Sequence, residues 1–114
     1  MDTRAADRVV IEKVLAEYAA IPYAHGKIET QIIFDRARDH YLLMIVGQEG
    51  HGAKRRIHGC LIHIDLIGDQ IIIQRDGTEH GIAPELVREG VAPERIVLAF
   101  HHLGARPYSS FLAA

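Results

Sequence analysis

The sequence has no tryptophan, a single cysteine, and only three phenylalanines and four tyrosines among its 114 residues. Its core must therefore be built mainly from aliphatic side chains. The lone Cys60 has no partner for an internal disulfide, which is typical of a protein that folds in a reducing cytoplasm. The longest apolar runs end after about six residues, whereas a membrane-spanning helix needs about 20. These absences favour a cytoplasmic protein without a membrane segment.

An excess of basic residues is also missing, because 13 lysines and arginines face 15 acidic residues and the net charge is −2. Sequence-independent DNA binding requires a clustered basic surface, so this balance argues against direct contact with nucleic acid. The one basic run is His51 with Lys54-Arg55-Arg56, beside a glycine-rich connection. With Arg75, it is the candidate surface for an acidic partner. The alternative is a solvated turn that keeps an exposed strand edge soluble.

The apolar spacing changes along the chain from a helical period to a period of two. Val10, Ile11, Val14 and Leu15 follow the pattern of one amphipathic helix from Ala5 to Ala20, which Pro22 ends. Four strand-like segments joined by short connections come next. Parallel strands would need longer crossovers, so an antiparallel meander is expected. The segments are a strand from Ile28, then His40–Gly47, Arg55–Ile67 and Gln70–Gln74.

The C-terminal third predicts one more helix and one more strand. Pro84 lies in the first turn of a short helix that runs to about Glu89, and Gly90 follows its end. Ile96 to Phe100 is typical of a short buried strand, and the remainder has loop character. The expected fold class is therefore α+β. An N-terminal helix packs on an antiparallel β-meander, followed by a short helix and a final strand, in a single domain over residues 1–114.

His63 and Asp65 are the first candidates for chemistry, because residues two apart in a strand share one face. A carboxylate there could orient the imidazole for acid–base work or metal binding. Strand alternation places His58 and Cys60 on the opposite face unless a bulge rotates the strand. Cys60, in line with Ile62, is then expected to be a small core residue. A structural or interface role is therefore favoured over a catalytic or metal-binding one.

A second polar group surrounds the corner between the last meander strand and the short helix. Its members are Asp76, Glu79, His80 and Glu85. Carboxylates beside a sheet end can hold a divalent cation through oxygen ligands. Turn chemistry is the favoured interpretation, because Asp76-Gly77 supplies the bend and Glu85 complements the dipole at the helix N-terminus.

Several catalytic motifs do not occur. The sequence has no Gly-x-Ser-x-Gly elbow, no Walker-type phosphate loop, no dinucleotide fingerprint, no Cys-x-x-Cys pair and no His-Glu-x-x-His. The prediction is therefore a non-enzymatic protein without cofactor or bound metal.

Four separated blocks resemble the XisI family, which is described as controlling factors for excision of the fdxN DNA element. The blocks are IETQIIFDRARDHYLLMIVG, RRIHGCLIHIDLIGDQIIIQRDG, GIAPELVREGVAPERIVLAFH and the ending RPYSSFLAA, and the resemblance covers nearly the whole chain. The family tends to carry tryptophan near Gln48 and near Ile72, where this chain has none. It also tends to have a few more residues between Gln48 and Lys54. The resemblance supplies no catalytic residues.

The resemblance implies a regulatory protein that acts with a XisH-like, nuclease-fold partner in site-specific excision of a DNA element. The predicted function is thus non-catalytic partner binding, by a homo-oligomer whose exposed sheet face or edge receives the partner. The alternative hypothesis is a metal-binding or hydrolytic enzyme that uses His63 and Asp65, with Asp76 nearby.

Overall fold

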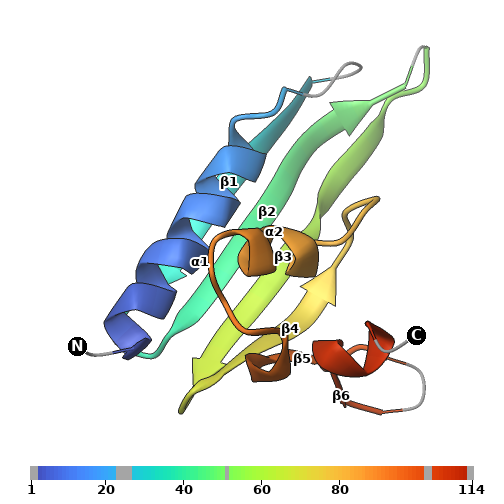
Figure 1. Cartoon of the computed structure of the whole chain (residues 1–114). Coiled ribbons are helices and arrows are strands. Elements are labelled where there is room, and N and C mark those ends of the chain that lie inside the picture. Colours follow the sequence, from blue (N-terminus) through green and yellow to red (C-terminus); the bar gives the residue numbers. More distant parts are fainter. Residues whose placement is uncertain (1–2, 23–26, 51, 102–103, 113–114) are drawn as a thin grey trace.

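The computed structural model describes residues 3–22, 27–50, 52–101 and 104–112. It has the predicted α+β architecture, with a long N-terminal helix, a sheet and a short second helix (Figure 1). The helices and strands are α1 Thr3–Ala19, β1 Lys27–Asp35, β2 His40–Glu49, β3 Arg55–Ile67, β4 Gln70–Asp76, α2 Ala83–Arg88, β5 Ile96–Leu98 and β6 Arg106–Pro107, with 3₁₀ turns η1 Pro93–Arg95 and η2 Tyr108–Phe111. Neither described helix is long and apolar enough to cross a bilayer.

The strands form one sheet in the order β1-β2-β3-β4-β5-β6. The first four are antiparallel neighbours, which confirms the predicted meander. β5 runs parallel to β4, because the chain crosses over through α2 before it returns to the sheet. The prediction of loop structure after Phe100 was wrong, since β6 pairs with β5 and η2 follows it. These short elements lack the periodic pattern by which longer ones are recognised.

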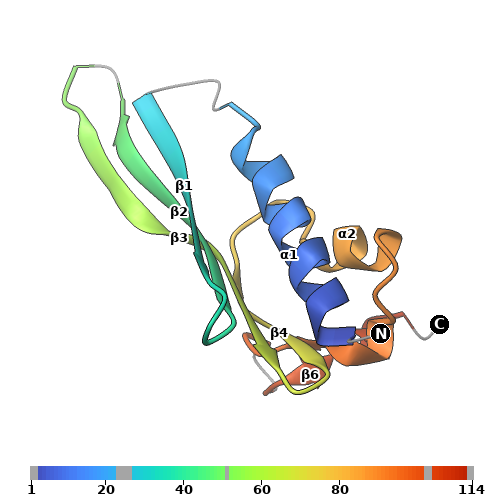
Figure 2. The ribbon, with the colours of Figure 1, turned by 90° about the vertical axis from the view of Figure 1, so that its left-hand side faces the viewer.

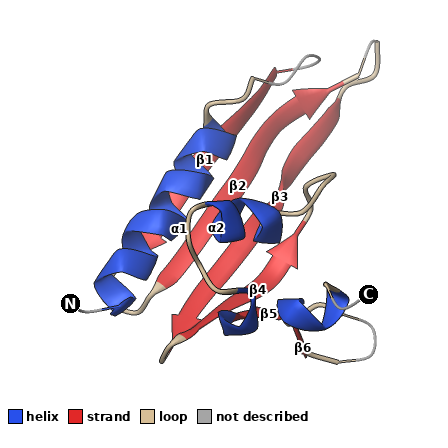
Figure 3. Ribbon diagram, viewed as in Figure 1, coloured by secondary structure: helices blue, strands red, loops and turns tan. Residues whose placement is uncertain are grey.

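Both helices cover the same face of the sheet, and no element of the described residues covers the other face (Figures 2 and 3). The aliphatic core lies between the helices and the sheet, as the shortage of aromatic residues predicts. Its fully buried large side chains are Ile11, Leu15, Tyr41, Leu43, Ile62, Ile64, Ile71, Ile73, Ile82, Leu86 and Ile96.

Arginine–carboxylate pairs tie α1 to the rest of the fold. Arg8 donates two hydrogen bonds to Asp39, at 2.7 and 3.1 Å, and the Tyr41 hydroxyl donates a third at 2.8 Å. The hydrogen bonds from Arg8 lower the pKa of Asp39 despite its burial. Burial, and then the contact with Asp39, raises the pKa of Tyr41 to about 12. Arg95 forms a second such pair with the buried Asp7 of α1.

Two irregularities in strand pairing decide which side chains reach the uncovered face. Met44 lies opposite Cys60 and Leu43 lies opposite Ile62, so Leu61 is an extra residue in β3. On the other side of β3, His63 lies opposite Arg75 and Ile64 opposite Ile73, so Gln74 is an extra residue in β4. Each bulge reverses the in–out alternation of its strand.

Candidate functional site

The bulge at Leu61 places the polar residues of β3 on one face. Leu43 is buried against the helices, so its partner Ile62 also faces the core, and Cys60 faces the other way with Met44. The expectation that Cys60 lines up with Ile62 in the core is therefore wrong. Strict alternation predicted that the polar side chains of β3 would be divided between two faces, and the extra residue removes that division.

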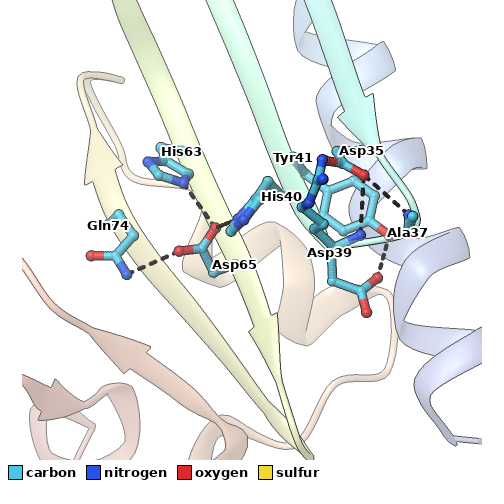
Figure 4. Close-up of polar contacts among 9 residues, drawn as sticks. Asp35, Ala37, Asp39, His40, Tyr41, His63, Asp65 and Gln74 are labelled. Carbon is cyan, nitrogen blue, oxygen red and sulfur yellow. Dashed lines mark hydrogen bonds and ion pairs between the residues drawn. The ribbon is translucent and has the colours of Figure 1, made fainter.

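A polar cluster occupies the uncovered face, where side chains from three neighbouring strands converge (Figure 4). Asp65 of β3 lies at its centre. Its Oδ1 atom is 2.6 Å from Nδ1 of His40 on β2 and 2.8 Å from Nε2 of His63. Its Oδ2 atom accepts a hydrogen bond of 3.1 Å from the side-chain amide of Gln74 on β4. We call His40, His63, Asp65 and Gln74 the Asp65 cluster.

Within the Asp65 cluster the carboxylate is buried, whereas the two imidazoles are accessible to solvent. The Asp65 side chain is 11% exposed, whereas the His40 and His63 side chains are 47% and 32% exposed. Burial raises the pKa of Asp65, but the hydrogen bonds from His40 and His63 outweigh it, and the net pKa is lowered. Asp65 is thus held as a carboxylate beneath two accessible imidazoles. One ligand atom from each of these three residues lies within 4.8 Å of the others, a spacing that can hold a metal ion.

Sequence reasoning found His63 and Asp65 but missed His40. His40 stands opposite Asp65 in the pairing of β2 with β3, 25 residues away along the chain. That register depends on the bulge, which has no local signature around Leu61. Gln74, the extra residue of β4, follows Ile72 by two positions and so brings an amide to the same face as Asp65.

Asp76 does not join the Asp65 cluster. It lies opposite the core-facing Ile62, and its carboxylate accepts hydrogen bonds from the backbone N–H groups of Thr78 at 3.0 Å and Ile82 at 2.8 Å. Glu85 pairs with Arg88 one helical turn away. These contacts are the turn and helix interactions that the favoured interpretation of this corner expects.

The cysteine is set apart from the histidines by its environment. Cys60 is half-buried, and its thiol donates a hydrogen bond of 3.2 Å to the carbonyl of Ile62. Burial raises the pKa of this thiol, so the protonated form is favoured. The environment of Cys60 therefore disfavours the thiolate that a nucleophile or metal ligand requires.

The basic residues gather along an edge of β3 that lacks a neighbouring strand. β4 pairs only with Ile62–Ile67, so within the described chain no strand lies beside Arg55–Leu61 on that side. A groove of about 600 Å³ follows this edge and is lined by Arg55, Arg56 and Arg75 among others. Arg75 donates to the carbonyl of Cys60 at 2.6 Å, and Arg55 pairs with Glu49 across the strands. Lys54 precedes the strand and is exposed, and His51 lies outside the described residues.

Apolar side chains surround the Asp65 cluster on the uncovered face. Ile33 and Ile67 are 49% and 58% exposed there. Strand pairing assigns seven apolar residues to this face: Ile33, Leu42, Met44, Val46, Ile67, Ile72 and Val97. We call the uncovered face of the sheet, which includes these residues and the Asp65 cluster, the bare face. A mixed apolar and polar surface of this kind is typical of a site for another macromolecule.

Comparison with known proteins places the chain among relatives of the same fold. The family model described as XisI protein matches residues 1–113. A solved XisI-like protein from Anabaena variabilis ATCC 29413 is 35% identical, with a TM-score of 0.72 over 88% of each chain. The fdxN element excision controlling factor XisI of the same organism is 24% identical, with a TM-score of 0.71 over 89% of each chain, a likeness of fold. No curated protein matches the sequence.

Proposed function

This chain belongs to the XisI family, and we propose that it is a cytoplasmic, non-catalytic regulatory protein that works by binding a XisH-like protein. The observation that carries the proposal is the edge of β3 from Arg55 to Gly59, which within the described chain has no strand beside it on the side away from β2 and is bordered by three arginines. Unpaired backbone groups of a strand edge bind an added strand through main-chain hydrogen bonds. The arginines add attraction for an acidic segment beside that strand.

Co-expression with a XisH-like protein tests this proposal. A tagged copy should retain the partner at low and moderate salt, with both proteins folded. Reversing two charges of the groove, Arg56→Glu with Arg75→Glu, should weaken the complex at least about tenfold because attraction becomes repulsion. Arg38→Glu is the matched control, since Arg38 is 79% exposed in the β1–β2 turn, away from the groove. Failure of the unchanged proteins to co-purify would contradict the proposal, as would equal effects of the two sets of variants.

We also propose that copies of the chain associate through the bare face, which leaves the β3 edge available to the partner. The positions near which the family tends to carry tryptophan, Gln48 and Ile72, both lie on that face by strand alternation. Sedimentation velocity on the purified protein is the test. Ile67→Lys should shift the population toward monomer, whereas Val9→Lys, at a 68% exposed position on α1, should not. A monomer at all concentrations would refute self-association and leave the partner proposal standing.

The metal-binding alternative gains one specific observation. His40 converges on His63 and Asp65, so the alternative has three ligands where the sequence suggested two. Asp76 takes no part in this arrangement.

A further inference from the structure

The three buried carboxylates of the described chain differ in how their charge is compensated. Asp7 and Asp39 each receive the guanidinium group of an arginine, Arg95 and Arg8. Asp65 is also buried, but its polar contacts come from two imidazoles and one amide. A buried carboxylate requires a cation or strong hydrogen bonds, because removal of its charge from water is costly. The fold therefore provides Asp65 with a different kind of partner.

The donor atoms around Asp65 indicate which kind of ion could bind there. Two imidazole nitrogens and one carboxylate oxygen are ligands that zinc and other first-row transition metals accept, and that magnesium does not prefer. We propose that His40, His63 and Asp65 bind one divalent transition-metal ion on the bare face. This inference stands apart from the partner proposal, because it involves neither the β3 edge nor its arginines.

The geometry needs only small side-chain movements to accept an ion. Metal–ligand bonds of about 2.1 Å place tetrahedral ligand atoms about 3.4 Å apart. In the present arrangement the two nitrogens lie 2.6 and 2.8 Å from Asp65 Oδ1, and all three atoms lie within 4.8 Å. The exposed imidazoles of His40 and His63 can move outward by the required fraction of an ångström. Asp65 stays in place on its strand.

Gln74 fits the role of a positioning residue for this site. Its amide donates to Oδ2 of Asp65 and leaves Oδ1 directed at the two imidazoles. Hydrogen bonds to a ligating carboxylate fix its orientation, and their loss typically weakens metal binding by about 10–100-fold. Three protein ligands leave a further coordination position open, as in zinc sites that bind water or an incoming group.

Metal titration of the full-length, untagged protein tests the proposal. After treatment with a chelator, Zn²⁺ should bind at one ion per chain in calorimetry, Co²⁺ should give visible absorption bands of a low-coordinate site, and Mg²⁺ should not compete. His40→Ala and His63→Ala should each weaken Zn²⁺ binding at least about tenfold. His58→Ala is the matched control, because His58 is an exposed histidine of the same strand that lies outside the cluster. Gln74→Ala should give a smaller loss than either ligand variant.

A measurement on the unchanged protein keeps the test decisive if a variant fails to fold. Nitrogen NMR of the imidazoles should show Zn²⁺ at Nδ1 of His40 and at Nε2 of His63, because these atoms face Asp65. Absence of stoichiometric binding would overturn the proposal. Binding that His58→Ala weakens as much as His40→Ala, or that leaves the His40 and His63 nitrogens unchanged, would overturn it equally.

Discussion

Two glycine-to-alanine substitutions in neighbouring strands should have opposite effects on stability. A methyl group on Gly47 of β2 would collide with the carbonyl oxygen of Lys27 and lie 2.8 Å from Cα of Ile28. Carbon atoms pack best at about 3.5–4.0 Å, so the backbone of β1 would have to move away from β2. At Gly59 of β3 a methyl group meets nothing within 4 Å. The same chemical change therefore meets a backbone barrier at one position and open space at the other.

The magnitudes follow from these surroundings. Overpacking typically costs about 1–3 kcal/mol, and we expect Gly47→Ala near the upper end because backbone cannot rotate aside as a side chain can. Gly59→Ala should stabilise the protein by about 0.4–1 kcal/mol, since alanine loses less conformational freedom on folding. The two variants should thus differ by roughly 3–4 kcal/mol in the free energy of unfolding.

Urea denaturation followed by far-ultraviolet circular dichroism measures this difference, and suits a protein without tryptophan. The slope with urea should stay the same while the midpoint moves in opposite directions. A loss of less than about 0.5 kcal/mol for Gly47→Ala, within the usual scatter of surface substitutions, would refute the close approach of β1 to β2.

The buried groups give three further predictions. Tyr41→Phe should cost about 1.5–3 kcal/mol in urea denaturation, because the hydroxyl donates to the Asp39 carboxylate, whereas Tyr18→Phe should cost little. Since the folded pKa of Asp39 is lowered, its contribution is complete above the unfolded pKa of about 3.9 and is lost as pH falls through the folded pKa. Arg8→Gln should move that loss to higher pH in a series of unfolding curves, and an unmoved acid midpoint would contradict the assignment. Cys60 should react slowly with a thiol reagent at pH 8 and rapidly in urea, because burial raises its pKa, and equal rates would argue against that burial.

Local rules predicted most of the fold, because its large elements carry strong periodic patterns. The helical spacing of Val10 to Leu15, Pro22 and the short hairpin connections were enough for α1 and the four-stranded meander. The parallel pairing of β5 with β4 is a tertiary outcome that no local pattern specifies. β6 is two residues long, below the length at which alternation can be recognised.

The Asp65 cluster was only half predictable for a related reason. His63 and Asp65 share a face by simple alternation, and the structure keeps them together. His40 joins them through the register of β2, which is set across the bulge at Leu61, and Gln74 joins them as the extra residue of β4. A bulge depends on how a whole strand pairs with its neighbours, so the residue types at Leu61 and Gln74 do not predict it.

The extra residue at Leu61 also separates β3 into two segments whose side chains can vary under different constraints. Between Leu61 and Ile67 the even-numbered side chains of β3 face the helices, whereas between Arg55 and Leu61 the odd-numbered side chains do so. If β3 kept Leu61 but paired regularly with β2, without the bulge, His58 and Cys60 would turn inward and Ile57 would face outward, while the remainder of the strand kept its orientation. Deletion of Leu61 would instead give a regular strand with Met44 still opposite Cys60 and Leu43 still opposite Ile62, so a relative with a gap at this point keeps the same positions on each face of the sheet.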